Sequence, residues 1–95
     1  MNSKDRYVRK MQARLDEWSS EIDALGARAG RATGELKVEY DRQIAGLKVK
    51  QVAARHKLGE MQQAGESAWE DLIAGADLAW SAMGEAVDSA RSRFR

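Results

Sequence analysis

The segment GARAGRATG, residues 26–34, decides the fold of this 95-residue chain. It places Gly26, Gly30 and Gly34 within a pattern that is otherwise helical. Three glycines weaken a helix by roughly 3 kcal/mol relative to alanine, so the chain could bend here. Alternatively, glycines four residues apart give a narrow helical face that suits close helix packing. We favour a continuous but weakened helix and keep a bend at 26–34 as the alternative.

Apolar residues at heptad spacing lead into this segment from its N-terminal side. From residue 15 to residue 36 the steps alternate between three and four, which is the spacing of a coiled-coil seam. Steps of four from Leu36 to Tyr40 and on to Ile44 mark a stutter, and Gln51 is the one plainly polar seam position. The pattern predicts one long helix over about residues 4–63.

A turn is predicted at about residues 64–66, because Gly65 can take the left-handed conformation that ends a helix. Ser67 followed by Glu70 forms a capping box, which marks the start of a second helix over about residues 67–94. Charge agrees with two antiparallel arms. Residues 42–57 carry Lys and Arg but no acid, whereas residues 66–88 carry Asp and Glu but no base.

The lengths of these two helices predict an oligomer. The first would be ~90 Å long and the second only ~42 Å, so the second can cover only half of the first. The uncovered stripe calls for another chain, most simply in a bundle with two-fold symmetry. The predicted self-association seam consists of Tyr7, Met11, Leu15, Trp18, Ile22, Leu25 and Leu36. The predicted hairpin packing consists of Tyr40, Ile44, Leu47, Leu58, Met61, Trp69, Leu72, Trp80, Met83, Val87 and Phe94.

The predicted fold class is therefore all-α, with residues 1–95 forming a single helical domain. Its architecture would be a long helical hairpin, a coiled coil, that assembles into an oligomeric helix bundle. If residues 26–34 bend instead, three arms of similar length would close as a monomeric three-helix bundle.

Composition excludes several classes of protein. The chain has no cysteine, which excludes a disulfide scaffold, a thiolate nucleophile and a Cys-ligated metal. Its 16 basic and 15 acidic residues give a net charge of +1, which disfavours a nucleic-acid binder. No apolar run is long enough to span a membrane, and the polar start has no signal core, so we expect a cytoplasmic protein.

No enzyme chemistry is predicted. His56 is the only histidine, and we expect it to be exposed beside Arg55 and Lys57 without an acidic neighbour at helical spacing. The sequence offers no Glu-x-x-His motif, catalytic grouping or nucleotide-binding loop. We therefore assign no catalytic, cofactor-binding or metal-binding residue and expect no cofactor.

Two functions fit this architecture. The first is a non-enzymatic self-assembly or scaffold protein, a homo-oligomer with room for a further protein partner. The alternative is a protein whose amphipathic helix, residues 67–94, coats a lipid or hydrophobic granule surface. This helix carries no base before Arg91, whereas helices on anionic membranes normally carry Lys and Arg, so packing against the basic arm explains it more simply.

Two stretches carry a family resemblance. They are YVRKMQARLDEWSSEIDAL, residues 7–25, and GESAWEDLIAGADLAWSAMGEAVDSARSRF, residues 65–94. The second stretch is the more specific, with its paired Trp69 and Trp80 and its final Ser-Arg-Phe. Together they cover about half of the chain, which resembles a bacterial family of short, largely uncharacterised coiled-coil proteins loosely labelled stress-response. The resemblance implies a soluble helical protein with no assigned catalytic residues.

Overall fold

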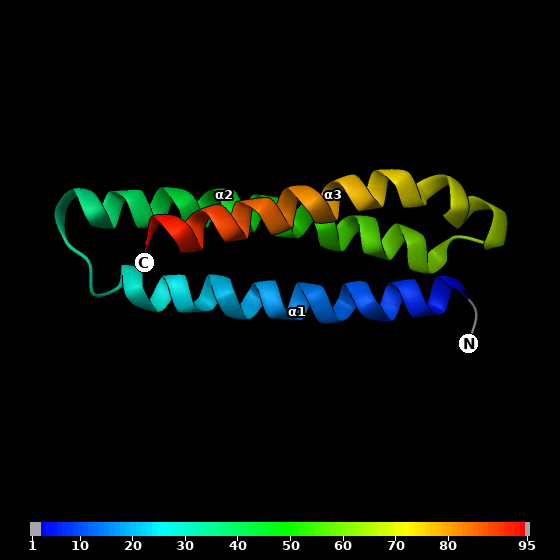
Figure 1. Ribbon diagram of the computed structural model, residues 1–95, viewed down its shortest axis with the longest axis horizontal. Coiled ribbons are helices and arrows are strands. Elements are labelled where there is room, and N and C mark those ends of the chain that lie inside the picture. The colour runs from blue at the N-terminus through cyan, green and yellow to red at the C-terminus, as the bar shows by residue number, and fades with distance from the viewer. Residues whose placement is uncertain (1–2, 95) are drawn as a thin grey trace.

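Three helices make up the computed structural model, which describes residues Ser3–Phe94. They are α1 (Ser3–Ala29), α2 (Gly34–Gln63) and α3 (Glu66–Arg93). Each helix runs antiparallel to the one before it, so α1 and α3 point the same way (Figure 1). The bundle measures 51 × 20 × 19 Å. The predicted domain also includes Met1, Asn2 and Arg95, which lie outside the described residues.

The all-α bundle is confirmed, but the continuous first helix is wrong. α1 ends at Ala29, and a short connection leads to α2, so one chain forms the three-helix bundle that was the alternative architecture. Gly34 begins α2 with a φ of 63°, a left-handed conformation that glycine adopts without steric cost. A bend at this position costs little conformational free energy, and it allows the apolar stripe of α1 to pack on the other two helices.

The second turn lies where it was predicted, but its geometry differs. Gly65 has a φ of −72° and a ψ of 170°, which is extended rather than left-handed backbone, and it is the N-cap of α3. The predicted capping box is therefore wrong, because Ser67 and Glu70 lie inside the first turns of α3 and are exposed. On the other side of this turn, Lys4 caps the C-terminal end of α2. Its Nζ donates to the carbonyl oxygen of Gln62 at 3.0 Å and to that of Ala64.

One hydrophobic core runs through the bundle and contains most of the residues predicted for the seam and the hairpin. Met11, Leu15, Trp18, Ile22 and Leu25 are all buried by the chain's own helices. The inference that this stripe lacks a partner within the chain is therefore wrong. Buried with it from the hairpin set are Tyr40, Leu47, Leu58, Met61, Trp80, Met83, Val87 and Phe94.

Five of the predicted residues are not fully buried. Tyr7, Ile44, Trp69 and Leu72 are partly buried and pack against the core. Leu36 was placed on the self-association seam, but it lies in the first turn of α2 and is 53% exposed. The change from one helix to the next, at residues 30–33, precedes Leu36, and the stutter from Leu36 to Ile44 lies within α2.

Candidate interaction surfaces

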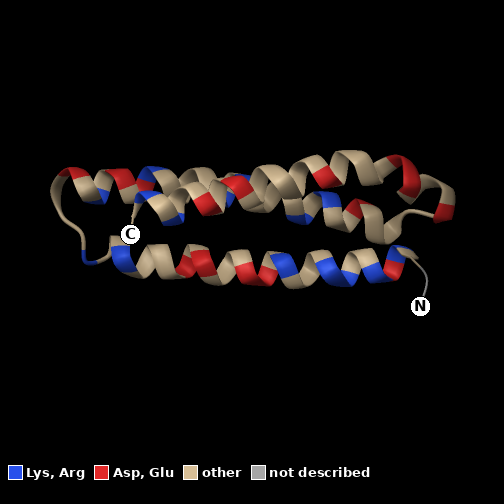
Figure 2. Cartoon of the chain, in the orientation of Figure 1, with Lys and Arg blue, Asp and Glu red and all other residues tan. Residues whose placement is uncertain are grey.

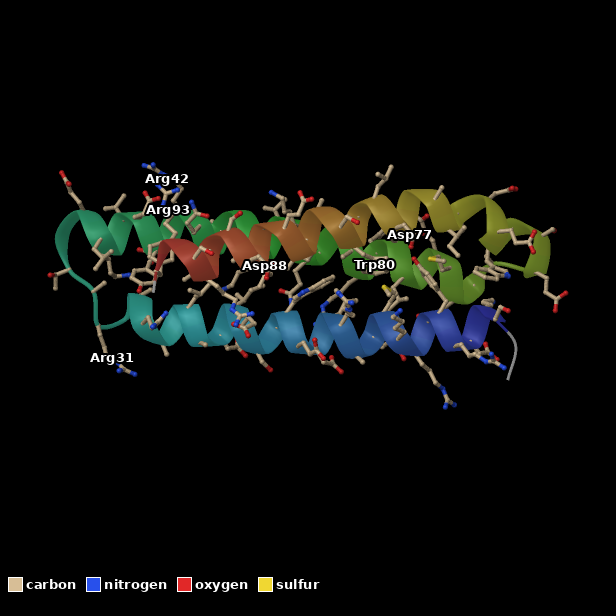
Figure 3. All side chains as sticks on the ribbon, viewed as in Figure 1. Arg31, Arg42, Asp77, Trp80, Asp88 and Arg93 are labelled. Carbon is tan, nitrogen blue, oxygen red and sulfur yellow. The ribbon has the colours of Figure 1, made fainter. Side chains whose placement is uncertain are left out.

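A hydrogen-bonded cluster joins the N-terminal part of α1 to the middle of α3. The Tyr7 hydroxyl donates to Asp77 Oδ1 at 2.5 Å and accepts from Trp80 Nε1 at 2.8 Å. The Tyr7 ring also lies 6.2 Å from that of Trp69, centroid to centroid. Figure 3 shows Trp80 between α3 and α1. This cluster satisfies the polar atoms of two large rings at the edge of the core.

The hydrogen bonds of the Tyr7 cluster hold α1 and α3 together and do not make Tyr7 reactive. Burial raises the pKa of Tyr7 above its ordinary value, and the hydrogen bond to Asp77 raises this pKa further. The phenol therefore stays neutral across the physiological range and acts as a hydrogen-bond donor. A phenol held neutral in this way is a poor nucleophile and a poor general base.

Polar contacts also fix the other two helix pairs. Between α1 and α2, Ser19 Oγ accepts hydrogen bonds from Gln51 Nε2 and, at 2.8 Å, from Arg55 Nη2. Gln51, the polar position in the predicted seam, thus has a partner within the chain. Between α2 and α3, Arg93 Nε lies 2.6 Å from Glu39 Oε1.

The C-terminal end of α3 is held by stacking and by a backbone contact. The rings of Tyr40 and Phe94 stack with their centroids 3.9 Å apart. Arg28 Nη1 donates to the Phe94 carbonyl oxygen at 2.7 Å, which joins the end of α1 to the end of α3. All three helices therefore meet at this end of the rod.

His56 is exposed as predicted, but the expectation that it lacks an acidic neighbour is wrong. Its Nδ1 lies 3.2 Å from Glu60 Oε1, one helical turn further on. Within Ser3–Phe94, no group of three or more His, Asp or Glu side chains is gathered as a metal ion would need. In the same range no helix is long and apolar enough to cross a membrane.

A second heptad pattern, missed in the sequence analysis, lies on the side of α2 that faces away from the core. Its members at residues 38, 42, 45, 49, 52 and 56 are separated by steps of four and three. Three valines stand out because they are 56%, 71% and 67% exposed, namely Val38, Val49 and Val52. We call this surface the α2 outer stripe; it consists of Val38, Arg42, Ala45, Val49, Val52 and His56. The heptad spacing of this stripe is visible in the sequence, but the core face of α2 carries larger apolar residues, and the predicted packing surface was placed on that face.

The outward side of α3 carries acidic residues, whereas the α2 outer stripe carries basic ones. Leu78 is 74% exposed, and Asp71 and Glu85 lie seven residues before and after it. We call this surface the α3 outer stripe; it consists of Asp71, Ala74, Leu78, Ala82 and Glu85, all of them exposed. Figure 2 shows acidic residues along α3, with its bases only near the C-terminal end.

Most charges of these two helices do not neutralise one another within the chain. Among the described residues, no ion pair joins the bases at positions 42–57 of α2 to the acids at positions 66–88 of α3. The ion pairs between helices use the C-terminal arginines of α3 instead: Arg93 with Glu39, and Arg91 with Glu21. Within the described residues, the basic block of α2 and the acidic block of α3 are therefore not paired with each other.

The α1–α3 seam is grooved, but most of the charged groups that line the groove already have partners within the chain. A shallow groove of about 470 Å³ near the end of α1 is lined by Glu21, Arg28, Arg31 and Arg91, among others. Arg91 Nε lies 3.6 Å from Glu21 Oε2, and Arg28 is bonded to the Phe94 carbonyl. The Arg31 side chain points away from the bundle (Figure 3). Two of the three arginines therefore already serve the chain's own acceptors.

Comparisons with known proteins give no relative. No protein-family model matches this chain, and no curated protein or solved structure matches it significantly. The resemblance to the stress-response coiled-coil family therefore stays a prediction. The geometry of the bundle and its surface stripes is the basis for a functional proposal.

Proposed function

We propose that this chain is a non-enzymatic self-assembly or scaffold protein that works as a homo-oligomer of three-helix bundles. One observation carries the proposal: the α2 outer stripe has the heptad spacing of a helix-packing surface, yet nothing in the described chain covers it. Its exposed valines lie on the opposite side of α2 from the core. Contiguous exposed apolar residues rimmed by polar ones mark interaction sites.

The proposed contact differs from the one the sequence first indicated. The large residues from Met11 to Leu25 are buried in the core, so they are not free to bind another chain. The surface available for assembly is made of smaller residues, which suits a weaker and reversible association. A cytoplasmic location and a role in stress remain parts of the proposal, and the role in stress rests on the family resemblance alone.

Sedimentation equilibrium over a wide range of protein concentration tests this proposal. We expect the average mass to rise with concentration at moderate ionic strength and to fall back in high salt, because exposed charges are screened. A mass that stays at 10.6 kDa at every concentration would contradict self-assembly.

Contact with an anionic lipid surface is the second candidate, and the basic residues beside the α2 outer stripe favour it. Lys48 and Lys50 are exposed on either side of Val49, and basic residues beside apolar ones suit anionic headgroups. The apolar face of α3, which first indicated lipid coating, is buried in the bundle and would be accessible only if the bundle opened.

Vesicle co-sedimentation separates the two candidates. Retention on anionic but not on neutral vesicles, abolished in a Val49→Glu variant, would support lipid contact through α2. Retention that survives this variant would point to another surface, such as an opened α3. No retention on either kind of vesicle would remove the lipid candidate and leave self-assembly.

A further inference from the structure

We propose that the α2 outer stripe of one copy binds the α3 outer stripe of a second copy. This inference rests on the proposed self-assembly and names the two surfaces that meet. One such contact leaves one stripe free on each copy, so further copies can add to form a ring or an open filament.

The first argument is the charge pattern at seven-residue spacing. Arg42, Val49 and His56 form a line on α2, with an apolar residue between two basic ones. Asp71, Leu78 and Glu85 form a line on α3 at the same spacing, with an apolar residue between two acids. When Leu78 lies on Val49, each acid therefore comes to lie across from Arg42 or His56.

The second argument is that the two basic side chains of the α2 stripe are exposed and can contact another chain. The side chains of Arg42 and His56 are 73% and 78% exposed. Their present partners, Glu39 at 3.8 Å and Glu60 at 3.2 Å, lie on the same helix and are also solvent-accessible. Glu39 is held more closely by Arg93, at 2.6 Å, which leaves most of the Arg42 guanidinium to a further acceptor.

The third argument excludes the simplest competitor, α2 against α2 of a second copy. Residues 42–57 contain no acid, so two such stripes would bring like charges together in either direction. Two α3 outer stripes would do the same with acids. Only the mixed pair brings base to acid while covering Val49 and Leu78.

The antiparallel direction is favoured by the opposing helix dipoles. In this direction Arg42 meets Glu85, and His56 meets Asp71. Small side chains then face each other on both sides of the central contact: Ala45 lies across from Ala82, and Ala74 lies across from Ala53, an exposed residue next to Val52. Small residues at these positions let the two helices approach closely enough for Val49 and Leu78 to touch.

Two half-blocked variants test the inference. Val49→Glu blocks the α2 stripe, and Leu78→Lys blocks the α3 stripe; both residues are largely exposed, so the fold should survive. We expect each variant alone to associate about thirtyfold more weakly than the wild type, the loss typical of a central interface residue. Mixed in equal amounts, the two should form a heterodimer, since each supplies the stripe that the other lacks.

Leu36→Glu is the matched control, because Leu36 is an exposed leucine outside both stripes and should leave assembly unchanged. If the wild type assembles and the mixed variants form no heterodimer, the pairing is wrong while self-assembly stands. If the wild type stays monomeric, both proposals are overturned. Circular dichroism on each variant checks that the fold is retained.

A charge exchange tests the direction. Arg42→Glu on the Leu78→Lys copy should weaken the heterodimer. Glu85→Arg on the Val49→Glu copy should then restore it. Restoration by Asp71→Arg in place of Glu85→Arg would overturn the antiparallel direction, because Arg42 meets Asp71 only when the helices run parallel.

Discussion

The core stripe of α1 and the outer stripe of α2 have the same heptad spacing but opposite environments. The large apolar residues of the α1 stripe, from Met11 to Leu25, are buried within the chain, whereas Val38, Val49 and Val52 are more than half exposed. The α1 stripe consists of large residues, and the α2 stripe interleaves valine and alanine with Arg42 and His56. Heptad spacing thus indicates that a helix surface can pack against another helix. The size and charge of its residues indicate whether that helix belongs to the same chain.

The largest difference between the stripes should be in stability. We expect Ile22→Ala to lower the free energy of unfolding by about 2–5 kcal/mol, because it leaves a cavity in the core. Val49→Ala should change it by less than about 0.5 kcal/mol, because this side chain is mostly in water. Chemical denaturation followed by circular dichroism, at a concentration low enough to keep the protein monomeric, measures both.

The loss of stability expected for Ile22→Ala should not be accompanied by a change in oligomer mass. Ile22→Ala should leave the association of the remaining folded protein unchanged, since Ile22 is buried in its own chain. If Ile22→Ala were tolerated while abolishing association, the α1 stripe would be an intermolecular seam after all. The comparison of the two stripes would then have to be reversed.

The sequence was sufficient to predict the all-helical class, the second turn and most of the core, but not the break between α1 and α2. Periodicity carries these features because any arrangement of amphipathic helices buries the same faces. Whether the α1 stripe packs on its own chain or on another could not be deduced, since both arrangements bury the same residues. That choice depends on residues 30–33, where a small backbone preference decides between two folds of similar core.

The Tyr7 cluster also lay beyond sequence analysis, because its members are far apart in the chain. Tyr7 contacts Asp77 and Trp80 across 70 and 73 residues. No periodic pattern relates α1 to α3 in this way, and only the bend at 30–33 brings them together. The cluster is thus a direct consequence of the three-helix arrangement.

A smaller effect is expected from removing the hydroxyl of this cluster. Tyr7→Phe should cost about 1–2 kcal/mol, because Trp80 Nε1 loses its acceptor and Asp77 its donor. Thermal or chemical unfolding measures this loss at neutral pH. Ser20→Ala is a suitable control, since Ser20 is exposed and bonds only to the Asp16 carbonyl one turn earlier.

The pH dependence of this pair gives a second test. The pKa of Tyr7 is raised in the folded protein, so the neutral phenol is favoured there. Its contribution to stability is complete below the ordinary tyrosine pKa of about 10 and is lost as pH rises towards the folded-state value. The stability difference between the wild type and Tyr7→Phe should therefore shrink above about pH 10. A difference that is constant from pH 7 to 11 would mean that the hydroxyl is not held by Asp77.

Small effects on stability are expected from substituting the glycines of the segment 26–34, and two of these substitutions should have opposite signs. Gly34 has a φ of 63°, so Gly34→Ala should destabilise the bundle by about 1 kcal/mol. Gly26 lies within α1, and a Cβ there would meet nothing within 4 Å, so Gly26→Ala should stabilise by about 0.5–1 kcal/mol. Denaturation midpoints of both variants, measured under the same conditions, test the sign directly. If Gly34→Ala were also stabilising, the chain would favour a continuous helix, and the α1 stripe would again need a second chain to cover it.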